Sequence, residues 1–278
     1  MTSAAVRAFR DRGLTAKKSF GQNFLVDPNT TLRVAELCAG DEPASTSERG
    51  TIVEIGAGLG ALTEPLLARA KRVLAIERDR DLCPLLRDAF SEPIASGRLV
   101  IVEADAKTVD LEGLLASGPA PRILAGNLPY QLTGPLLERA TQLAKVIDRA
   151  AFMVQAEVAD RLAAEPGSEA YGALTVFVTA AFRVRRAMSV SRGAFHPRPG
   201  VDSAVVVLVP HRPARAEETD RFREAVRAAF SQRRKTLRNA WAKLGEPDKI
   251  RARAEAAGID LARRGETLSV EEFARFAQ

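Results

Sequence analysis

The stretch VEIGAGLGALTEPLL, residues 53–67, decides the fold of this chain. It begins as an apolar strand, passes through glycines at every second position, and ends with the apolar spacing of a helix. Glycine permits a tight turn and lets backbone N–H groups approach a ligand closely. We predict a strand–turn–helix unit with Gly56, Gly58 and Gly60 in the turn, one residue short of the dinucleotide pattern G-x-G-x-x-G. A turn of this kind also occurs for packing reasons alone.

Short apolar segments recur on both sides of this unit at intervals that leave room for helices. They are TIVEI (51–55), RVLAI (72–76), LVIVE (99–103), RILAG (122–126) and AAFMV (150–154). Near-continuous apolar strands separated by helix-length segments indicate a parallel sheet covered by helices on both faces. Two later segments, ALTVFVTAAFRVRR (173–186) and SAVVVLVP (203–210), are expected to pair as an antiparallel edge. The predicted class is α/β.

After Pro210 the sequence becomes polar and then helical. HRPARAEETD (211–220) has the composition of a linker. From an N-cap at Thr219 to Gly245, one apolar stripe predicts a single long helix through Phe222, Val226, Phe230, Leu237, Trp241 and Leu244. Shorter helices are expected at about 248–257 and 269–277. We therefore predict a large domain at residues 1–210, with a basic N-terminal arm, and a small all-α domain at 211–278.

The chain is moderately basic, with a formal net charge of +6 and a pI near 9.7. Two basic clusters stand out: an N-terminal one at Arg7, Arg10, Arg12, Lys17 and Lys18, and a C-terminal one at Arg233, Arg234, Lys235 and Arg238. Either cluster alone is compatible with a solvated surface. Together with the basic pI they favour a polyanionic partner such as RNA.

Other classes of protein are disfavoured by composition. No apolar run reaches the roughly 18 residues of a membrane span, and residues 1–20 lack the apolar core of a secretory signal. Cys38, Cys83, His196 and His211 are too few for a disulfide framework or a metal cluster. We expect a cytoplasmic, metal-free protein with no membrane partner, and no feature requires more than a monomer.

Acidic residues follow the next two predicted strands. Glu77 ends the second strand, about 20 residues beyond the glycine turn, where an acid meets ribose hydroxyls in nucleotide-binding folds. Asp105 follows the third strand, where it would accept from an adenine amino group. No residues suited to hydride transfer accompany them, and Glu54 before the turn suits a cationic ligand. The predicted cofactor is S-adenosylmethionine, which has no phosphate.

The segment AGNLPY, residues 125–130, ends the fourth predicted strand beside this site. The exocyclic amino group of adenine is a poor nucleophile because its lone pair is delocalised into the ring. Asn127 Oδ1 and the carbonyl of Leu128 would accept its two hydrogens and free that lone pair. Pro129 restricts Leu128 to extended conformations, and Tyr130 offers a ring for stacking. A plain Asn-Pro turn is the simpler interpretation of the same residues.

A base held between two rings needs a second aromatic residue. Phe195, stiffened by the prolines of FHPRPG (195–200), is the candidate. Methyl transfer from a sulfonium needs no strong base at the attack step, so His196 is interpreted as a loop residue. The predicted mechanism is in-line displacement by a positioned, desolvated amino group, on a base unstacked from a loop or single strand.

At these residues the chain resembles the ribosomal RNA adenine dimethyltransferase family. The resemblance covers nearly the whole chain and is most specific at KKSFGQNFL (17–25) and FSQRRKTLRNAW (230–241). It implies two methyl transfers to each of two adjacent adenosines, in a hairpin loop near the 3′ end of 16S rRNA in the small ribosomal subunit, with a role in subunit biogenesis. Two alternative functions remain open: a resistance methylase of large-subunit rRNA, and a non-catalytic RNA-binding assembly factor.

Carried over residue by residue, the resemblance implies cofactor contacts from Asn23, Leu25, Gly56, Gly58, Glu77, Asp105 and Asn127. It implies RNA contacts from the C-terminal basic cluster. From physical reasoning alone, GQNFL (21–25) is only a turn after a basic arm; in the family it helps close the cofactor site. Two positions depart from the family pattern. Ala156 stands where a lysine is common, which puts one RNA contact in doubt. Trp241 stands where a leucine is usual, and we expect this change to be an adjustment of the core.

Overall fold

The structure, a computed structural model, describes residues 2–40, 50–232 and 234–278. Contacts between residues divide the chain into two compact units. Unit 1 comprises Met1–Ala159 and Arg185–Val209, and unit 2 comprises Asp160–Val184 and Pro210–Gln278. The segment Asp160–Val184 thus packs with the C-terminal residues, although the sequence places it well before the predicted boundary at residue 210.

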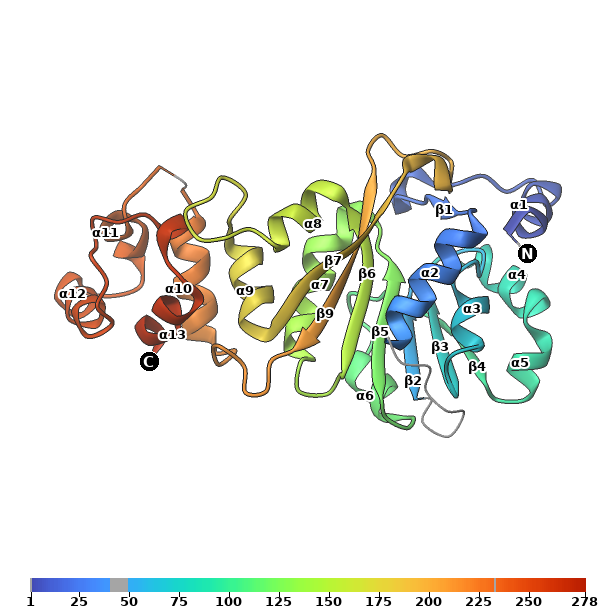
Figure 1. The fold of residues 1–278 in the computed structure, drawn as a ribbon, viewed down its shortest axis with the longest axis horizontal. Helices are drawn as coiled ribbons and strands as arrows, with labels where there is room; N and C mark the ends of the chain where they lie inside the picture. The colour runs from blue at the N-terminus through green and yellow to red at the C-terminus, as the bar shows by residue number, and fades with distance from the viewer. Residues whose placement is uncertain (1, 41–49, 233) are drawn as a thin grey trace. The chain divides into compact units, whose positions relative to one another are not determined.

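A seven-stranded sheet forms the centre of the larger unit, in the order β4-β3-β2-β5-β6-β9-β7 (Figure 1). The five predicted strands are confirmed and run parallel: β2 (Thr51–Ile55), β3 (Arg72–Glu77), β4 (Leu99–Glu103), β5 (Arg122–Asn127) and β6 (Arg149–Gln155). Strand β9 (Ser203–Pro210) pairs antiparallel with β6, and β7 (Phe182–Val190) lies next to β9 at the edge. The predicted α/β class is confirmed.

The strand order reverses direction between β2 and β5. From β2 the chain adds β3 and β4 on one side, then returns to place β5 and β6 on the other. A ligand site in an open α/β sheet lies beyond the carboxyl ends of the strands at such a point, because the outgoing connections diverge there. Gly56, Glu77 and Asn127 stand at or just after the ends of β2, β3 and β5.

Helices pack on the sheet along their apolar faces. Helix α2 (Pro28–Ala39) contacts β5 and β6, and α3 (Thr63–Leu67) contacts β3; both lie in front of the strands in Figure 1. Asp27 caps α2 by accepting from the backbone N–H of Thr30 at 3.0 Å. The other helices of this unit are α1 (Thr2–Asp11), α4 (Leu82–Ala89), α5 (Ser91–Ala95), α6 (Leu111–Ala116) and α7 (Thr133–Gln142).

One predicted strand is a helix over most of its length. Residues 173–186 were expected to be extended, but Ala173–Ala181 form α9 and only the residues from Phe182 onward join β7. The backbone N–H of Gly172 donates to Thr175 Oγ1 at 3.2 Å at the start of this helix. The prediction was wrong because α9 is apolar on nearly all sides, so its sequence lacks the polar stripe that marks a surface helix.

Unit 2 is a small helical bundle around an aromatic core. After α8 (Ala156–Leu162), whose last residues belong to it, it contains α9, α10 (Asp220–Phe230), α11 (Leu237–Ala240), α12 (Pro247–Ala256) and α13 (Val270–Ala277). Thr219 caps α10 as predicted, and α12 and α13 confirm the two shorter helices. Trp241 is fully buried and stacks on Phe276 with ring centroids 3.7 Å apart, which confirms it as a core residue.

The predicted single helix from Thr219 to Gly245 is wrong. It ends at Phe230, and the chain becomes helical again only at Leu237. The backbone N–H groups of Leu237 and Arg238 donate to the carbonyls of Arg263 and Leu261, at 2.8 and 3.0 Å, instead of to the preceding turn. This tertiary pairing competes with the helix and divides it.

Within the described parts of the chain, every helix falls short of the length or apolar character that crossing a bilayer requires.

Candidate active site

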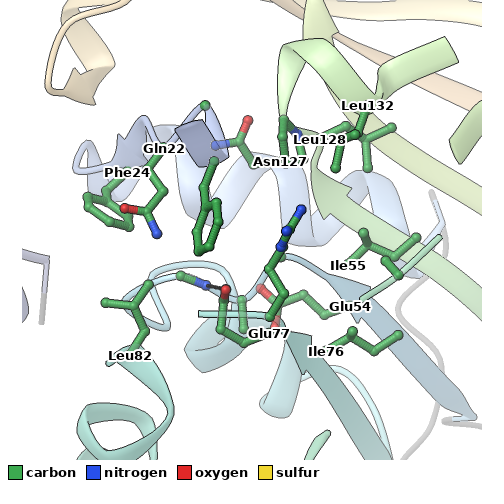
Figure 2. Close-up of a pocket in the computed structure, with 18 of the residues that line it drawn as sticks. Gln22, Phe24, Glu54, Ile55, Ile76, Glu77, Leu82, Asn127, Leu128 and Leu132 are labelled. Atoms are coloured by element: carbon green, nitrogen blue, oxygen red, sulfur yellow. Dashed lines mark hydrogen bonds between the residues drawn. The ribbon is translucent and has the colours of Figure 1, made fainter. Parts of the chain in front are cut away.

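A pocket opens at the carboxyl ends of β2, β3 and β5 (Figure 2). It brings together ten residues that the sequence predicts for the site: Asn23, Leu25, Gly56, Gly58, Glu77, Asp105, Asn127, Leu128, Pro129 and Tyr130. Apolar side chains such as Ile55, Ile76 and Leu132 form much of the remaining wall. In this view Asn127 lies on one side of the pocket, with Glu54 and Glu77 on the other. The pocket therefore combines an apolar slot with polar groups at its ends.

The glycine turn after β2 forms one wall of the pocket. Gly56, Gly58 and Gly60 have φ values of 74°, 59° and 79°, in the left-handed region that glycine tolerates best. A side chain on Gly58 would also meet the ring of Phe24 at 3.3 Å. The backbone N–H of Gly58 donates to Glu77 Oε2 at 2.8 Å, so this turn directs a donor at a carboxylate of the protein itself. A phosphate bound at this turn would have to compete with the Glu77 carboxylate for the backbone N–H of Gly58.

Glu77 is 6% exposed and is held at both oxygens. Besides the bond from Gly58, its Oε1 accepts from the backbone N–H of Asp79 at 2.8 Å. Burial raises the pKa of Glu77, and the two backbone donors oppose that rise. Each carboxylate oxygen has two acceptor sites, so these bonds still leave capacity for a pair of ligand hydroxyl groups.

Glu54 lines the pocket from inside β2 and is 1% exposed. The hydroxyl of Thr63 donates to Glu54 Oε2 at 2.6 Å. Burial raises the pKa of Glu54 to about 7; the Thr63 hydrogen bond lowers it, and the charge of Glu77 raises it further. A positive charge in the pocket would favour the ionised form of this carboxyl group.

Asp105 follows β4 and reaches the pocket from the far side of β3. Its Oδ2 lies 3.6 Å from Arg78 Nη1, and its Oδ1 accepts from the backbone N–H of Lys107 at 2.9 Å. Arg78 in turn lies over the ring of Phe20, with its guanidinium carbon 4.4 Å from the ring centroid. Asp105 is thus oriented by neighbouring groups while its side chain stays 28% exposed at the pocket.

The amide of Asn127 is oriented by the N-terminal segment. Asn127 Nδ2 donates to the backbone carbonyl of Asn23 at 3.0 Å, so its Oδ1 is directed to the other side of the amide. The backbone N–H of Leu128 donates to the carbonyl of Met153 on β6 at 3.0 Å. Gly126 is needed just before, because a side chain there would overlap the carbonyl oxygen of Ile55. These contacts fix the strand end from which Asn127 projects.

The residues after Asn127 form a tight, hydrogen-bonded turn. Pro129 has φ −57° and ψ 128°, and its carbonyl accepts from the backbone N–H of Leu132 at 2.8 Å. Tyr130 is half-buried, and its hydroxyl lies 2.9 Å from Ser203 Oγ at the start of β9. Burial raises the pKa of Tyr130, so its phenol stays neutral. Tyr130 therefore lines the pocket while its hydroxyl is anchored at Ser203.

Phe195 is the predicted site residue that does not line the pocket. It is 4% exposed and belongs to the hydrophobic core cluster around α2 and the sheet. Its strand, β8 (Phe195–His196), runs antiparallel to β1 (Phe24–Leu25), and Phe195 lies opposite Leu25, which belongs to the same core cluster. This placement gives no support to the predicted stacking role of Phe195, and it leaves Tyr130 as the aromatic residue of the motif at the pocket.

Several contacts at or beside the pocket come from residues to which physical reasoning on the sequence gave no role; only the resemblance placed GQNFL (21–25), with Gln22 and Phe24, at the cofactor site. Gln22 Nε2 donates to Asp79 Oδ2 at 2.7 Å, and Lys17 Nζ donates to Asp79 Oδ1 at 2.5 Å. Phe24 lines the pocket and packs edge-on against Phe9, with the two ring centroids 5.4 Å apart. The proximity of Asp79 to Glu77 was the available signal, but nothing in the sequence links either residue to position 17 or 22.

The pocket fits the predicted cofactor better than a dinucleotide. Glu54, Glu77 and Asp105 make its lining acidic, and the basic residue Arg78 is paired with Asp105. Negative phosphates would be repelled by these carboxylates, whereas a sulfonium and an ammonium group would be attracted. Among the residues that the structure describes, no group of three or more His, Cys, Asp or Glu side chains is arranged to hold a metal ion.

The predicted RNA-binding cluster lies in unit 2. Arg234, Lys235 and Arg238 are exposed, the first two in the turn after α10 and the last on α11. Arg233 lies outside the described residues. Leu237, between these cations, is fully buried, so one short segment carries both a core residue and exposed charge.

Comparisons with known proteins identify relatives of this chain. Residues 13–278 match the family described as "Ribosomal RNA adenine dimethylase". A protein of Anaeromyxobacter sp. (strain K) named "Ribosomal RNA small subunit methyltransferase A" is 44% identical, over 96% of this chain and 95% of the relative.

Two solved structures also match over most of the chain. A dimethyladenosine transferase from Plasmodium falciparum has a TM-score of 0.72 at 24% identity and covers 90% of this chain and 94% of its own, which shows a shared fold. The 23S rRNA methyltransferase ErmE has a TM-score of 0.64 at 25% identity and covers 92% of this chain and 98% of its own.

Proposed function

We propose, from the premise that this chain belongs to the ribosomal RNA adenine dimethylase family, that it dimethylates the N6 amino groups of two adjacent adenosines in 16S rRNA. The adenosines would lie in a hairpin loop near the 3′ end of the small-subunit RNA, and S-adenosylmethionine would supply the methyl groups. The relative named as a small-subunit methyltransferase supports this choice of substrate.

The observation that carries the proposal is the orientation of Asn127. Because its Nδ2 donates to the carbonyl of Asn23, its Oδ1 is left to accept a hydrogen from a substrate amino group. The carbonyl of Leu128 is the second acceptor, since Pro129 keeps Leu128 extended and directs that carbonyl. An amino nitrogen whose two hydrogens are held in this way moves toward tetrahedral geometry and becomes a better nucleophile.

The cofactor would supply an electrophilic methyl group on a positively charged sulfur. We infer that Glu77 holds the ribose hydroxyls and Asp105 the adenine amino group, while Glu54 faces the cationic part. The amino nitrogen would bond to the methyl carbon, the electron pair of the carbon–sulfur bond would pass to sulfur, and one amino proton would be released. Positioning and desolvation by the apolar wall then account for much of the rate.

The same residues suffice for the second transfer. After one methylation the amino nitrogen has one hydrogen, and one of the two acceptors is enough to hold it. Tyr130 would stack on the target base once that base has left its RNA loop, a contact worth about 1–3 kcal/mol. Arg233, Arg234, Lys235 and Arg238 would contact RNA phosphates, which attract arginine and lysine without regard to sequence.

Methyl transfer to purified subunits tests the proposal. Small and large ribosomal subunits from cells without this gene are incubated with the protein and labelled cofactor, and dimethyladenosine is then mapped by mass spectrometry. We expect two adjacent dimethyladenosines in small-subunit RNA and no label in the large subunit. Label in large-subunit RNA would assign the activity of a resistance methylase, and small-subunit binding without label would indicate an assembly factor.

A further inference from the structure

Two residues of the N-terminal segment are bound by one buried carboxylate next to the pocket. Lys17 Nζ donates to Asp79 Oδ1 at 2.5 Å and to Asp81 Oδ2 at 2.6 Å. Gln22 Nε2 donates to Asp79 Oδ2 at 2.7 Å, and Gln22 Oε1 accepts from the backbone N–H of Lys17 at 2.7 Å. We call Lys17, Gln22 and Asp79 the clasp. The proposed methyl transfer uses none of the three directly.

Asp79 depends on these donors because it is 2% exposed. Burial acts to raise the pKa of Asp79, but the hydrogen bonds from Lys17, Gln22 and the Asp81 backbone, together with the charge of Lys17, hold the pKa below its usual value. The carboxylate is therefore charged and is held by Lys17, Gln22 and the backbone N–H of Asp81, 3.1 Å from Oδ1; losing a donor is strongly disfavoured for a buried charge. The clasp is accordingly a specific contact rather than a loose surface ion pair.

The clasp joins both ends of the active site through short contacts. On one side, the backbone N–H of Asp79 donates to Glu77 Oε1 at 2.8 Å. On the other, Gln22 precedes Asn23, whose carbonyl accepts from Asn127 Nδ2 at 3.0 Å. Asp79 thus touches the acid assigned to the cofactor, and Gln22 holds the segment that orients the amide assigned to the substrate.

We propose that Gln22, held by Asp79 and Lys17, is a positioning residue that keeps the oxygen of the Asn127 amide facing the substrate. An amide presents an acceptor on one side and a donor on the other, and rotation about its last bond exchanges the two. The Asn23 carbonyl selects one orientation because it accepts only from nitrogen. If the segment 17–23 moves away, that selection is lost, and a donor can face the substrate amino group. This inference rests on the proposed function.

The test exchanges the charge of one clasp contact. Gln22→Glu keeps the shape of the side chain but sets a carboxylate against Asp79. Adding Asp79→Asn restores a complementary pair of opposite polarity, with the new amide as donor. Glu36→Gln, at an exposed ion pair of α2 in which Arg33 lies 3.0 Å away, is the matched control for a carboxylate–amide exchange.

For each variant we would measure kcat and KM on small subunits, Kd for S-adenosylhomocysteine, and the thermal midpoint. We expect Gln22→Glu to lower kcat by about tenfold or more, with KM for the subunit within about twofold, because small misplacements of reacting groups have large effects on rate. S-adenosylhomocysteine should bind several-fold more weakly. The double variant should recover most of both losses, and the control should match the parent protein.

A Gln22→Glu variant with unchanged kcat and unchanged affinity would overturn the inference. A second outcome would also overturn it: a lower thermal midpoint, with a lower kcat and a higher KM in proportion, and no recovery in the double variant. That outcome would indicate a structural role only. If the parent protein fails to methylate small subunits, the proposed function fails. The binding of S-adenosylhomocysteine by the three variants then still decides whether the clasp shapes the pocket.

Discussion

Both compact units have apolar cores, but among the described residues only unit 1 also buries acidic side chains. In unit 1, Glu54, Glu77 and Asp79 are at most 6% exposed, and all three lie at or beside the pocket. In the described part of unit 2, the buried side chains are apolar or aromatic, with Thr175 as the exception. The polar atom of Trp241 in that core is satisfied by a single bond, from Nε1 to the carbonyl of Ala225 at 2.9 Å.

This difference associates ligand binding with the buried carboxylates of unit 1 and fold stability with the aromatic core of unit 2. A buried carboxylate lowers the stability of a fold unless specific donors hold it, so three such groups around one pocket indicate selection for a ligand. An aromatic core such as that of unit 2 contributes to the stability of the fold through burial and ring packing. We therefore expect substitutions in the core of unit 2 to change unfolding, and substitutions at the pocket to change chemistry.

The largest effect is expected from Trp241→Ala in unit 2. The side chain is fully buried and stacked on Phe276, so its loss leaves a cavity and should lower the free energy of unfolding by about 3–5 kcal/mol. Urea unfolding would measure this change, and calorimetry with S-adenosylhomocysteine would test the pocket. Trp241→Phe should have a smaller effect. Loss of cofactor-product affinity in parallel with stability would contradict the separation between the units.

Asn127→Ala should give the next largest effect, and on turnover rather than unfolding. Removing one group that holds the reacting nitrogen should lower kcat by roughly 10²–10³-fold, by analogy with the loss of a group that stabilises a transition state. Binding of S-adenosylhomocysteine and RNA should stay within several-fold. Single-turnover kinetics would measure the change, with Asn29→Ala on the exposed surface of α2 as control. Unchanged turnover would show that another group holds the amino nitrogen.

The pH dependence of stability should report Glu54. Burial raises its pKa from 4.5 to about 7, so between these values the folded protein keeps a proton that the unfolded chain has released. This carboxyl group therefore lowers stability progressively as pH rises through that window, by at most about 3 kcal/mol. Glu54→Gln should be more stable than the parent at pH 8 and differ less at pH 5, as measured by urea unfolding. An equal difference at both pH values would show that Glu54 is not protonated in the fold.

The smallest effect is expected from the exposed cations of unit 2. Replacing Arg234 and Arg238 with glutamine should leave unfolding unchanged and reduce the slope of log K against log salt by about 0.7–0.9 per lost phosphate contact. Filter binding to a 16S rRNA fragment at several salt concentrations would measure the slope. Replacing Lys249 and Arg251, which are exposed on α12, provides a control of equal charge. Equal slopes in the two double variants would assign Arg234 and Arg238 a structural role.

Much of unit 1 could be predicted because its signals are local. Five strands were recognised from continuous apolar runs, since strands buried on both faces tolerate few polar residues. The turn at Gly56–Gly60 was recognised because positive φ values favour glycine. The polar ends of β3 and β5 were grouped into one site because parallel strands bring their carboxyl ends to the same edge.

The errors fell where long-range contacts override local pattern. Helix α9 resembles a strand in sequence because it is buried on nearly all sides, and α10 ends early because Leu237 and Arg238 pair with residues more than 20 positions away. Phe195 was expected at the pocket, but it is buried in the core cluster, where β8 pairs with the distant strand β1. In each case the deciding partner is distant in the chain.

The amino acids by themselves determined the sheet, the glycine turn and the chemistry of the groups at its edge, because apolar periodicity, glycine and proline act on the backbone within a few residues. Only the tertiary structure decided how those groups are oriented: that Asn127 donates to Asn23, that Asp79 binds Lys17 and Gln22, and that Glu54 is buried beside Glu77. Hydrogen bonds and burial depend on which distant segments meet, and that information exists only once the chain has folded.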